Sequence, residues 1–292
     1  MHRGRFAPSP TGPLHFGSLV AAVGSWLFAR SGGGEWLVRM EDLDRKREVP
    51  GAAADILSTL TAFGLESDRE VVVQSARTTH YARALRTLDL AGHVYRCWCS
   101  RSDLDPFKGI HPAQCPSSPG ARTPAWRVRV GTEIEQFNDA IQARLTQDLA
   151  REVGDFVVWR ADGVCAYQLA VVVDDDAQGI TQVVRGADLL DSTPRQRLLL
   201  RMLGMASPTY VHLPVVLGDD GRKLSKVDRA TPVDASNPLP ALRAALRFLG
   251  QEPPAGGDAR TLLSAAVAAF DPALIPRSAT IPLRYAATQK DL

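Results

Sequence analysis

The sequence predicts an α/β fold built on a doubly wound parallel sheet, with an inserted unit and a short helical segment at the C-terminal end. Strand-like and helix-like segments alternate over residues 1–77, and such alternation is typical of parallel sheets covered by helices. The alternation stops over residues 78–160, where cysteine, proline and glycine interrupt the pattern. It resumes over residues 161–237, and helix-like repeats dominate residues 238–292. These four ranges are the predicted units of the chain.

The first half of the predicted sheet domain begins with a strand at residues 3–7. That strand runs into the loop Pro8-Ser9-Pro10-Thr11-Gly12-Pro13, whose prolines exclude a helix or a central strand. A helix follows, because apolar side chains recur at helical spacing from Leu19 to Leu27, and Gly32-Gly33-Gly34 ends it. The remaining elements of this half are a strand at 35–40, a helix at 52–63 and a strand at 71–73.

The inserted range is predicted to hold a helix at residues 81–91 and a strand at 126–130, where alternation of apolar and polar residues indicates antiparallel pairing. Beyond it, the continuous apolar run at 167–173 predicts a strand that is buried on both faces. The other predicted elements are a strand at 180–185, a helix at 194–203, a strand at 212–217, and helices at 239–249 and 262–270.

The composition is that of an ordinary globular protein, with 45% hydrophobic and 23% charged residues and a net charge of +2. No apolar run approaches the ~20 residues that span a bilayer. The basic N-terminus meets Pro8 and Pro10 before any apolar segment, so it does not read as a signal peptide. We therefore expect a cytoplasmic protein that has no membrane partner. The net charge neither demands nor excludes a nucleic-acid partner.

Three of the four cysteines lie in the inserted range, within the pattern C-x-C-x11-H-x3-C formed by Cys97, Cys99, His111 and Cys115. Three thiolates and an imidazole match a tetrahedral structural zinc site. Because the segment is rich in loops and poor in apolar residues, a metal would stabilise it. The alternative is a set of half-buried thiols. Cys165 stands alone and is predicted to be a core residue.

Two loops contain the residue types that phosphate chemistry requires. The first loop delivers His15 and Gly17 to the N-terminus of a helix, where free N–H groups and the helix dipole favour phosphate. The second, Gly218-Asp219-Asp220-Gly221-Arg222-Lys223-Leu224-Ser225-Lys226, can stabilise a transferring phosphoryl group through its lysines. Taken singly, the first loop fits a proline turn with a surface histidine, and the second fits a solvated hairpin.

In this order the two loops resemble the two signatures of class I aminoacyl-tRNA synthetases. The segments between them narrow the resemblance to the glutamyl-tRNA synthetase family, over Arg5 to about Lys226. These segments are Arg39-Met40-Glu41-Asp42-Leu43-Asp44, Tyr167-Gln168-Leu169-Ala170-Val171-Val172-Val173-Asp174-Asp175, Gly179-Ile180-Thr181-Gln182-Val183-Val184-Arg185-Gly186 and Ser192-Thr193-Pro194-Arg195-Gln196. The resemblance implies a Rossmann-like catalytic domain.

The resemblance also implies the chemistry. His15, Lys223 and Lys226 would be the catalytic residues. His15, Gly17 and Lys226 would bind ATP, which reacts as its complex with Mg²⁺. The carboxylate of the amino acid itself attacks the α-phosphate, so no covalent enzyme intermediate forms, and the protein positions the reactants and stabilises charge. The family's second histidine in the first signature is Ser18 here, to which no catalytic role is assigned.

The amino acid that the resemblance implies is L-glutamate, whose two carboxylates and one ammonium need partners of both signs. Arg5 and Arg185 can each grip a carboxylate in bidentate fashion. Glu41 can meet the ammonium group, and Tyr167 can add a hydrogen bond. The family match extends the same binding site along the first loop to Phe6, Ala7, Pro8 and Ser9.

Only 66 residues follow Lys226 in this chain of 292, too few for the helical domains with which a full synthetase grasps the anticodon. The pattern therefore resembles the truncated branch of the family, whose members transfer glutamate to queuosine at the wobble position of tRNA(Asp). The inserted range would then face the anticodon loop, and no obligate protein partner is indicated. Two alternatives stay open: a minimal synthetase that charges a tRNA 3′ end, and a non-catalytic tRNA-binding paralogue.

Overall fold

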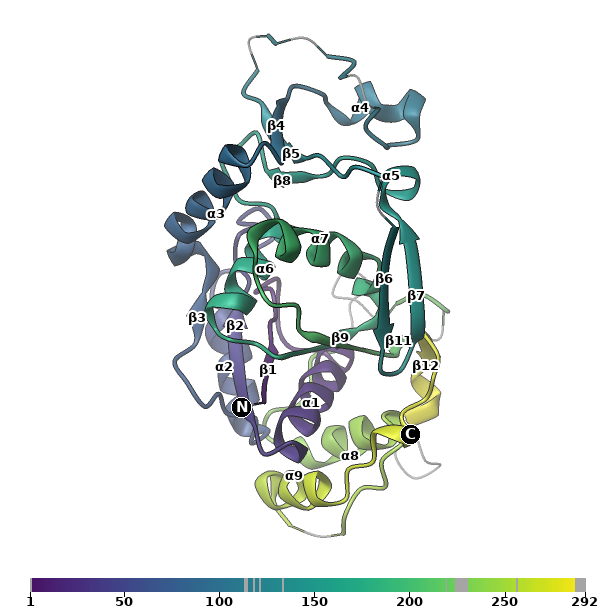
Figure 1. The fold of residues 1–292 in the computed structure, drawn as a ribbon. Helices are drawn as coiled ribbons and strands as arrows, with labels where there is room; N and C mark the ends of the chain where they lie inside the picture. Colours follow the sequence, from purple (N-terminus) through teal and green to yellow (C-terminus); the bar gives the residue numbers. More distant parts are fainter. Residues whose placement is uncertain are drawn as a thin grey trace.

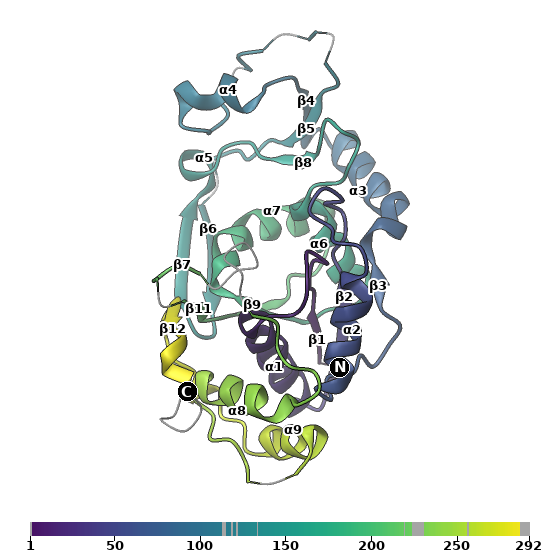
Figure 2. The same cartoon turned by 180° about the vertical axis from the view of Figure 1, so that it is seen from behind.

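The computed structural model describes residues 2–112, 115–117, 119–120, 122–132, 134–218, 220–223, 231–255 and 257–286. The molecule is elongated, and the small antiparallel sheet of the inserted segment lies at one end of it (Figure 1). Helices near the C-terminus lie at the other end, and the parallel strands lie between the two (Figures 1 and 2).

The N-terminal half forms a three-stranded parallel sheet in the order β1-β2-β3. Its strands are β1 (Arg3–Phe6), β2 (Glu35–Met40) and β3 (Val72–Val73), joined through helices α1 (Phe16–Ser31) and α2 (Ala52–Ala62). Strand β2 is buried on both faces, and its buried residues are apolar apart from Arg39. All five elements confirm the predicted alternation.

A second sheet has the order β7-β6-β10-β9. Strand β10 (Thr209–Leu213) runs parallel to β9 (Gln182–Gly186) and to β6 (Ile134–Asp139), and β7 (Ala143–Asp148) closes an antiparallel hairpin with β6. The backbone N–H of Thr181 donates to the carbonyl of Arg3 at 3.0 Å and so ties the β9 edge to β1. The structure thus has two sheets where the sequence predicted one, and β1 of the first sheet lies next to β9 of the second.

The strand predicted at residues 167–173 is wrong, because this segment belongs to helix α6 (Tyr167–Ala177). The helix is buried over most of its circumference, from Leu169 through Asp175. A helix buried on every side loses the apolar–polar periodicity that identifies helices, and its β-branched residues then read as a strand.

The single strand predicted at residues 212–217 is also wrong, because two strands share this segment. Strand β10 ends at Leu213, and β11 (Val215–Leu217) begins after Pro214, which has no N–H to donate. Strand β11 pairs in parallel with β12 (Thr280–Pro282), which the sequence did not reveal. The C-terminal segment therefore adds a strand to the predicted helices.

The inserted segment starts with α3 (Thr78–Leu90) and forms an antiparallel sheet of β4 (Val94–Cys97), β5 (Ala125–Val128) and β8 (Val157–Trp159). Strand β5 confirms the antiparallel strand predicted at residues 126–130. Two short helices complete the segment, α4 (Arg101–Leu104) and α5 (Leu149–Glu152). The β6–β7 hairpin also lies within residues 78–160, yet it belongs to the second sheet, where β6 pairs with β10.

Helix α7 (Thr193–Leu203) follows β9, and helices α8 (Pro238–Phe248) and α9 (Ala259–Ala268) follow the second loop. Helices α8 and α9 pack beneath α1, where Phe16 meets Phe248 edge to face at 6.2 Å. Short 3-10 turns, written η, follow β3, α4, β9, α9 and β12. These turns are η1 (Gln74–Arg77), η2 (Asp105–Phe107), η3 (Ala187–Ser192), η5 (Pro272–Leu274) and η6 (Leu283–Ala286). Among the described residues, no helix is long and apolar enough to cross a membrane.

Candidate active site

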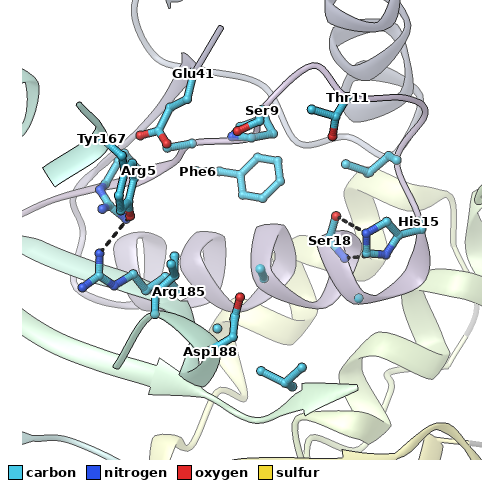
Figure 3. Close-up of a pocket in the computed structure, with 18 of the residues that line it drawn as sticks. Arg5, Phe6, Ser9, Thr11, His15, Ser18, Glu41, Tyr167, Arg185 and Asp188 are labelled. Atoms are coloured by element: carbon cyan, nitrogen blue, oxygen red, sulfur yellow. Dashed lines mark hydrogen bonds between the residues drawn. The ribbon is translucent and has the colours of Figure 1, made fainter. Parts of the chain in front are cut away.

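A pocket of about 720 Å³ opens where the carboxyl ends of β1 and β9 meet. This is the point at which strand order reverses in a doubly wound sheet, and ligands of such folds bind there. Arg5, Glu41 and Arg185 lie at one end of the pocket, and His15 with Ser18 lies at the other (Figure 3). The pocket is lined by nearly every predicted site residue: Arg5, Phe6, Ala7, Pro8, Ser9, His15, Gly17, Glu41, Tyr167, Arg185 and Lys223. Lys226 lies outside the described residues.

Arg5, on β1, is buried and already holds a carboxylate of the protein. Its Nε donates to Asp175 Oδ1 at 3.1 Å, and its Nη2 donates to Asp175 Oδ2 at 3.3 Å. Asp175 comes from α6, so the helix supplies the counter-charge. Burial works to raise the pKa of Asp175, but Arg5 and Arg39 outweigh it and keep that pKa below the ordinary value. The Arg5 guanidinium is therefore compensated within the fold.

Glu41 lies at the end of β2, next to a second buried arginine. Arg39 Nη2 donates to Asp175 Oδ1 at 2.7 Å and to Glu41 Oε1 at 3.4 Å. Burial is the largest effect on Glu41 and raises the pKa of its carboxyl despite the nearby Arg39 and Arg5. A buried carboxylate that is incompletely compensated is suited to receive a cation such as an ammonium group.

Arg185, near the end of β9, differs from Arg5 because its partners carry no negative charge. Its Nη2 donates to Thr193 Oγ1 at 2.8 Å, its Nη1 to the Tyr167 hydroxyl at 3.4 Å and its Nε to His212 Nε2 at 3.1 Å. The Nδ1 of His212 lies 2.6 Å from Asp139 Oδ2. The guanidinium is thus fixed in place from behind while it lines the pocket.

The other end of the pocket is the N-terminus of α1. His15 is the N-cap, and its Nδ1 accepts the Ser18 backbone N–H at 3.3 Å while its Nε2 lies 3.0 Å from Ser18 Oγ. Gly17 lies in the first turn of the helix, and no acidic residue occupies that turn. A helix of 16 residues that begins in a pocket offers N–H groups and a positive dipole end to an anion. Lys223 reaches the same pocket and pairs with Asp188 at 2.5 Å.

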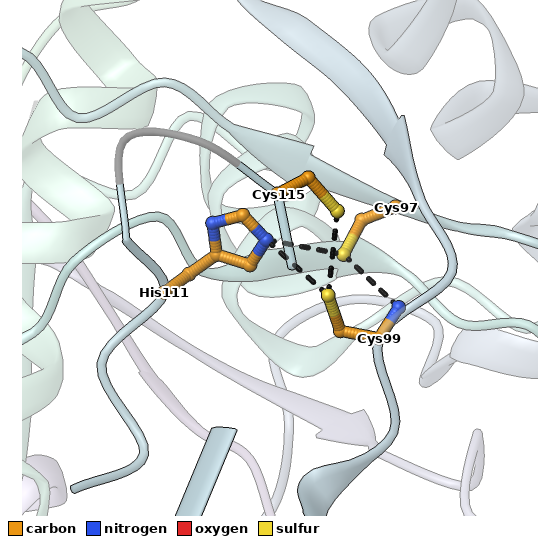
Figure 4. A group of neighbouring side chains, drawn as sticks. All are labelled: Cys97, Cys99, His111 and Cys115. Carbon is orange, nitrogen blue, oxygen red and sulfur yellow. Dashed lines mark hydrogen bonds between the residues drawn. The ribbon is translucent and has the colours of Figure 1, made fainter. Parts of the chain in front are cut away.

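The predicted metal ligands converge in the inserted segment (Figure 4). One donor atom from each of Cys97, Cys99, His111 and Cys115 lies within 4.8 Å of all the others. Cys99 and Cys115 Sγ are 3.3 Å apart, and His111 Nε2 is 3.4 Å from Cys97 Sγ. A tetrahedral zinc site has donor separations of roughly 3.5–3.8 Å, so this cluster is close to the size of such a site.

The surroundings of the cluster leave one ring nitrogen of His111 for a metal. His111 Nδ1 lies 2.8 Å from the carbonyl oxygen of Pro112, which can only accept a hydrogen bond. The proton therefore sits on Nδ1, and the Nε2 lone pair faces the thiols. Arg127 Nε donates to Cys97 Sγ at 3.2 Å, which suits a thiolate. The cluster can hold a metal ion.

A parallel-sheet fold with its pocket at the switch point, bounded by a helix N-terminus and by charged residues, defines a nucleotide-binding α/β enzyme. The comparison with known families agrees and is more specific. Residues 2–249 match the family described as tRNA synthetases class I (E and Q), catalytic domain. The chain belongs to this family.

Individual relatives narrow the comparison further. The chain is 57% identical over 284 residues to a protein of Xanthomonas campestris pv. campestris named glutamyl-Q tRNA(Asp) synthetase, covering 96% of this chain and 95% of the relative. A relative of the same name from Pseudomonas paraeruginosa is 52% identical over 283 residues, covering 96% of this chain and 97% of the relative. A solved glutamate tRNA ligase from Elizabethkingia meningosepticum, in complex with its amino acid, superposes with a TM-score of 0.81 at 25% identity, covering 98% and 68% of the two chains.

The structure also adds residues that the sequence analysis did not single out: Arg39, Asp139, Asp175, Thr193 and His212. Asp175 carried a signal, because it is a charged residue that follows the apolar run at 167–173, which was predicted to be buried. Asp139 and His212 carried none, since they are 73 residues apart and meet only through the pairing of β6 with β10.

Proposed function

We propose that this chain activates L-glutamate with ATP and Mg²⁺ to form glutamyl-adenylate, and transfers the glutamate to queuosine at the wobble position of tRNA(Asp). One observation carries the proposal: a single pocket brings cationic and anionic side chains to one end and the N-terminus of α1 to the other. The relatives named glutamyl-Q tRNA(Asp) synthetase, matched over nearly their full length, support the choice of acceptor. ATP and tRNA are cytoplasmic substrates, so we place the reaction in the cytoplasm.

Glutamate would occupy the charged end of the pocket. Glu41 would receive the ammonium group, and Arg185 the side-chain carboxylate, with the Tyr167 hydroxyl close to both. Arg5, already paired with Asp175, would hold the α-carboxylate side of the amino acid together with the backbone from Phe6 to Ser9. Each charge of the amino acid then meets the opposite charge inside a partly dehydrated pocket, where such pairs are strong.

ATP would place its phosphates at the N-terminus of α1, beside His15 and Gly17, with Lys223 and Lys226 supplying positive charge. A carboxylate oxygen of glutamate attacks the α-phosphorus, the bond to the bridging oxygen breaks, and pyrophosphate leaves with the electron pair. The negative charge increases on the phosphoryl oxygens during this step, so N–H groups and lysines aimed there stabilise the transition state more than the ground state.

The inserted segment would be a tRNA-facing subdomain stabilised by one zinc ion, with Cys97, Cys99, His111 and Cys115 as ligands. We propose the range 78–160 for it, 1–77 and 161–237 for the two halves of the catalytic domain, and 238–292 for the C-terminal segment. Zinc would provide a cross-link for the loop-rich stretch that joins β4 to β5, to which Cys99, His111 and Cys115 belong.

Two measurements test the proposal in sequence. The first is amino-acid-dependent exchange of labelled pyrophosphate into ATP, with and without tRNA. Glutamate should support exchange, while glutamine and aspartate should not. The second is transfer of labelled glutamate to tRNA(Asp) purified from cells that make queuosine and from cells that lack it. Transfer to the first tRNA alone is the expected result, and charging of tRNA(Glu) at its 3′ end would instead indicate a minimal synthetase.

A further inference from the structure

The partners of Arg185 form a buried chain that ends at Asp139. Arg185 Nε donates to His212 Nε2, and His212 Nδ1 lies against Asp139 Oδ2. The Asp139 and His212 side chains are completely buried. Oδ1 of the same carboxylate accepts the backbone N–H groups of Ile141, Gln142 and His212 at 2.9–3.2 Å. Asp139 is therefore an ionised group with a full set of donors, held at the tip of the β6–β7 hairpin.

Hydrogen-bond chemistry leaves only one protonation state for His212. A guanidinium has donors and no acceptor, so Nε2 must offer its lone pair to Arg185. Thr193 Oγ1 also lies 3.2 Å from Nε2, and its hydroxyl can donate to the same lone pair while its oxygen accepts from Arg185. An ionised carboxylate has acceptors and no donor, so Nδ1 must carry the proton. His212 is thus neutral, with its proton on Nδ1. Burial, the largest effect, also lowers the pKa of His212 and favours the neutral ring.

This arrangement separates the charge of Asp139 from the charge of Arg185. Direct contact between the two would give a compensated pair like Arg5 with Asp175. A neutral imidazole between them holds the guanidinium while leaving its positive charge unneutralised. Among the described residues, Thr193, Tyr167 and His212 accept three of its five N–H groups. One N–H then remains on each terminal nitrogen, as many as a carboxylate accepts in bidentate fashion.

We propose that Asp139 and His212 are positioning residues that determine specificity: they hold Arg185 through a neutral acceptor and so reserve its charge for the side-chain carboxylate of the substrate. A charged carboxylate gains from the uncompensated guanidinium, whereas a neutral carboxamide gains far less. The pair would therefore set the preference for glutamate over glutamine. This inference rests on the proposed glutamate activation.

Asp139→Asn is the decisive variant because it reverses the tautomer with little change of shape. The asparagine carbonyl can still accept the three backbone N–H groups, but its NH₂ now faces His212 Nδ1. The histidine proton must then move to Nε2, where it opposes the Arg185 Nε–H. We expect the KM for glutamate in pyrophosphate exchange to rise about tenfold to a hundredfold, with a similar loss of preference over glutamine. The KM for ATP and kcat should change less than about twofold.

Asp258→Asn is the matched control. Asp258 caps α9, where it accepts the Thr261 N–H at 2.8 Å, and asparagine caps as well as aspartate. His212→Gln and His212→Phe form a second pair. Glutamine can present an oxygen to Arg185 and should keep most of the glutamate preference, while phenylalanine fills the space without an acceptor and should lose it. A purely structural role would impair both variants alike, in kcat and in the KM for ATP as much as in the KM for glutamate.

Nitrogen NMR of protein labelled in its histidines reports the tautomer independently of activity. The wild type should show His212 protonated on Nδ1 and Asp139→Asn should show it on Nε2, with the signal assigned by its loss in His212→Gln. The inference is overturned if the wild-type ring carries its proton on Nε2, or if Asp139→Asn stays within twofold of Asp258→Asn in the glutamate KM. Absence of any glutamate-dependent exchange in the wild type would instead refute the proposed function, and the NMR result would still test the hydrogen-bond assignment.

Discussion

At the scale of residues, the pocket contains two buried arginines with different electrostatic surroundings. Arg5 is paired with Asp175 in bidentate fashion, so removing it uncovers a buried carboxylate. Arg185 has neutral partners among the described residues, so removing it uncovers no charge. The same substitution at the two positions should therefore have different consequences for stability and for substrate binding.

Arg185→Gln should raise the KM for glutamate by about two orders of magnitude, because it removes the buried charge that we propose binds the side-chain carboxylate of the substrate. Its Tm should fall by no more than about 2 °C. Arg5→Gln should lower Tm by several degrees, since the buried Asp175 loses one of its two arginine partners. Thermal unfolding and pyrophosphate exchange measure both effects, with the exposed Arg151→Gln as control. Equal losses of Tm in Arg5→Gln and Arg185→Gln would contradict the difference in electrostatic surroundings between the two arginines.

Glu41→Gln should weaken glutamate binding by about two orders of magnitude and yet stabilise the protein at neutral pH. Burial raises the pKa of Glu41 in the folded state, so folding favours its protonated form. The cost of burying the charge is present at high pH and disappears as pH falls below the ordinary value of 4.5, where Glu41 is protonated whether the chain is folded or not. The Tm advantage of Glu41→Gln should thus be present at pH 8 and shrink at pH 5. A wild type with a higher Tm than Glu41→Gln at pH 8 would refute this prediction.

How much of the site the sequence reveals depends on how local each contact is. Arg5, Glu41 and Arg185 belong to short motifs, and the structure places all three in one pocket. The roles assigned to these residues stay predictions. Asp139 and His212 belong to no recognised motif, because their contact depends on a hairpin that pairs across the second sheet. Periodicity describes neighbours along the chain and does not report which strands become neighbours in space.

At the scale of elements, helices α1 and α3 were predicted from the sequence, whereas helix α6 and the β6–β7 hairpin were not. Helix α1 begins at a polar N-cap and ends at glycine, and the predicted and observed elements agree there. Residues 169–175 of helix α6 are buried between α3, α7 and the sheets. The helix presents Asp174 and Asp175 to partners that come from four other elements. Tertiary packing overrides β-propensity in such a helix.

Two glycines that follow helices allow a controlled test of close packing between elements. Gly204 after α7 and Gly250 after α8 both have positive φ, 69° and 72°. A Cβ at Gly204 would meet open space, while one at Gly250 would collide with the backbone carbonyl of Leu274. Gly204→Ala should cost about 1 kcal/mol through backbone strain alone, and Gly250→Ala should cost at least about 2 kcal/mol more. Denaturant unfolding measures both, and equal losses would contradict the contact.

Loss of the metal at the cysteine cluster should affect the two steps of the reaction, glutamate activation and transfer to tRNA, to different degrees. Purified protein is expected to contain about one zinc ion per chain, and Cys97→Ser or Cys115→Ser should contain none. Because the cluster lies in the inserted segment and the pocket lies at the β1–β9 junction, glutamate-dependent pyrophosphate exchange should survive zinc loss while transfer to tRNA falls at least about tenfold. Cys165→Ala is the control for metal content. Zinc retention in Cys97→Ser, or equal loss of both activities, would refute this division.

At the scale of the whole molecule, the fold arranges its functions along one axis. The antiparallel sheet of the inserted segment lies at one end, and α8 and α9 support α1 from the other end (Figures 1 and 2). The pocket lies at the junction of β1 and β9, the strands at which the two larger sheets meet. The inserted segment, which would contact tRNA, is thus joined directly to the second sheet through the pairing of β6 with β10. We infer that the anticodon loop would approach the pocket from the side of the inserted segment.

The most direct test of this account is to identify the nucleoside that receives glutamate. Purified protein, ATP and labelled glutamate are incubated with tRNA(Asp) that contains queuosine, the tRNA is digested, and its nucleosides are separated. We predict that the label elutes as a glutamylated form of queuosine. The same digest of tRNA(Asp) that lacks queuosine should contain no labelled nucleoside. Label on the 3′-terminal adenosine of either tRNA would contradict the central claim and would identify the chain as a synthetase that charges acceptor ends.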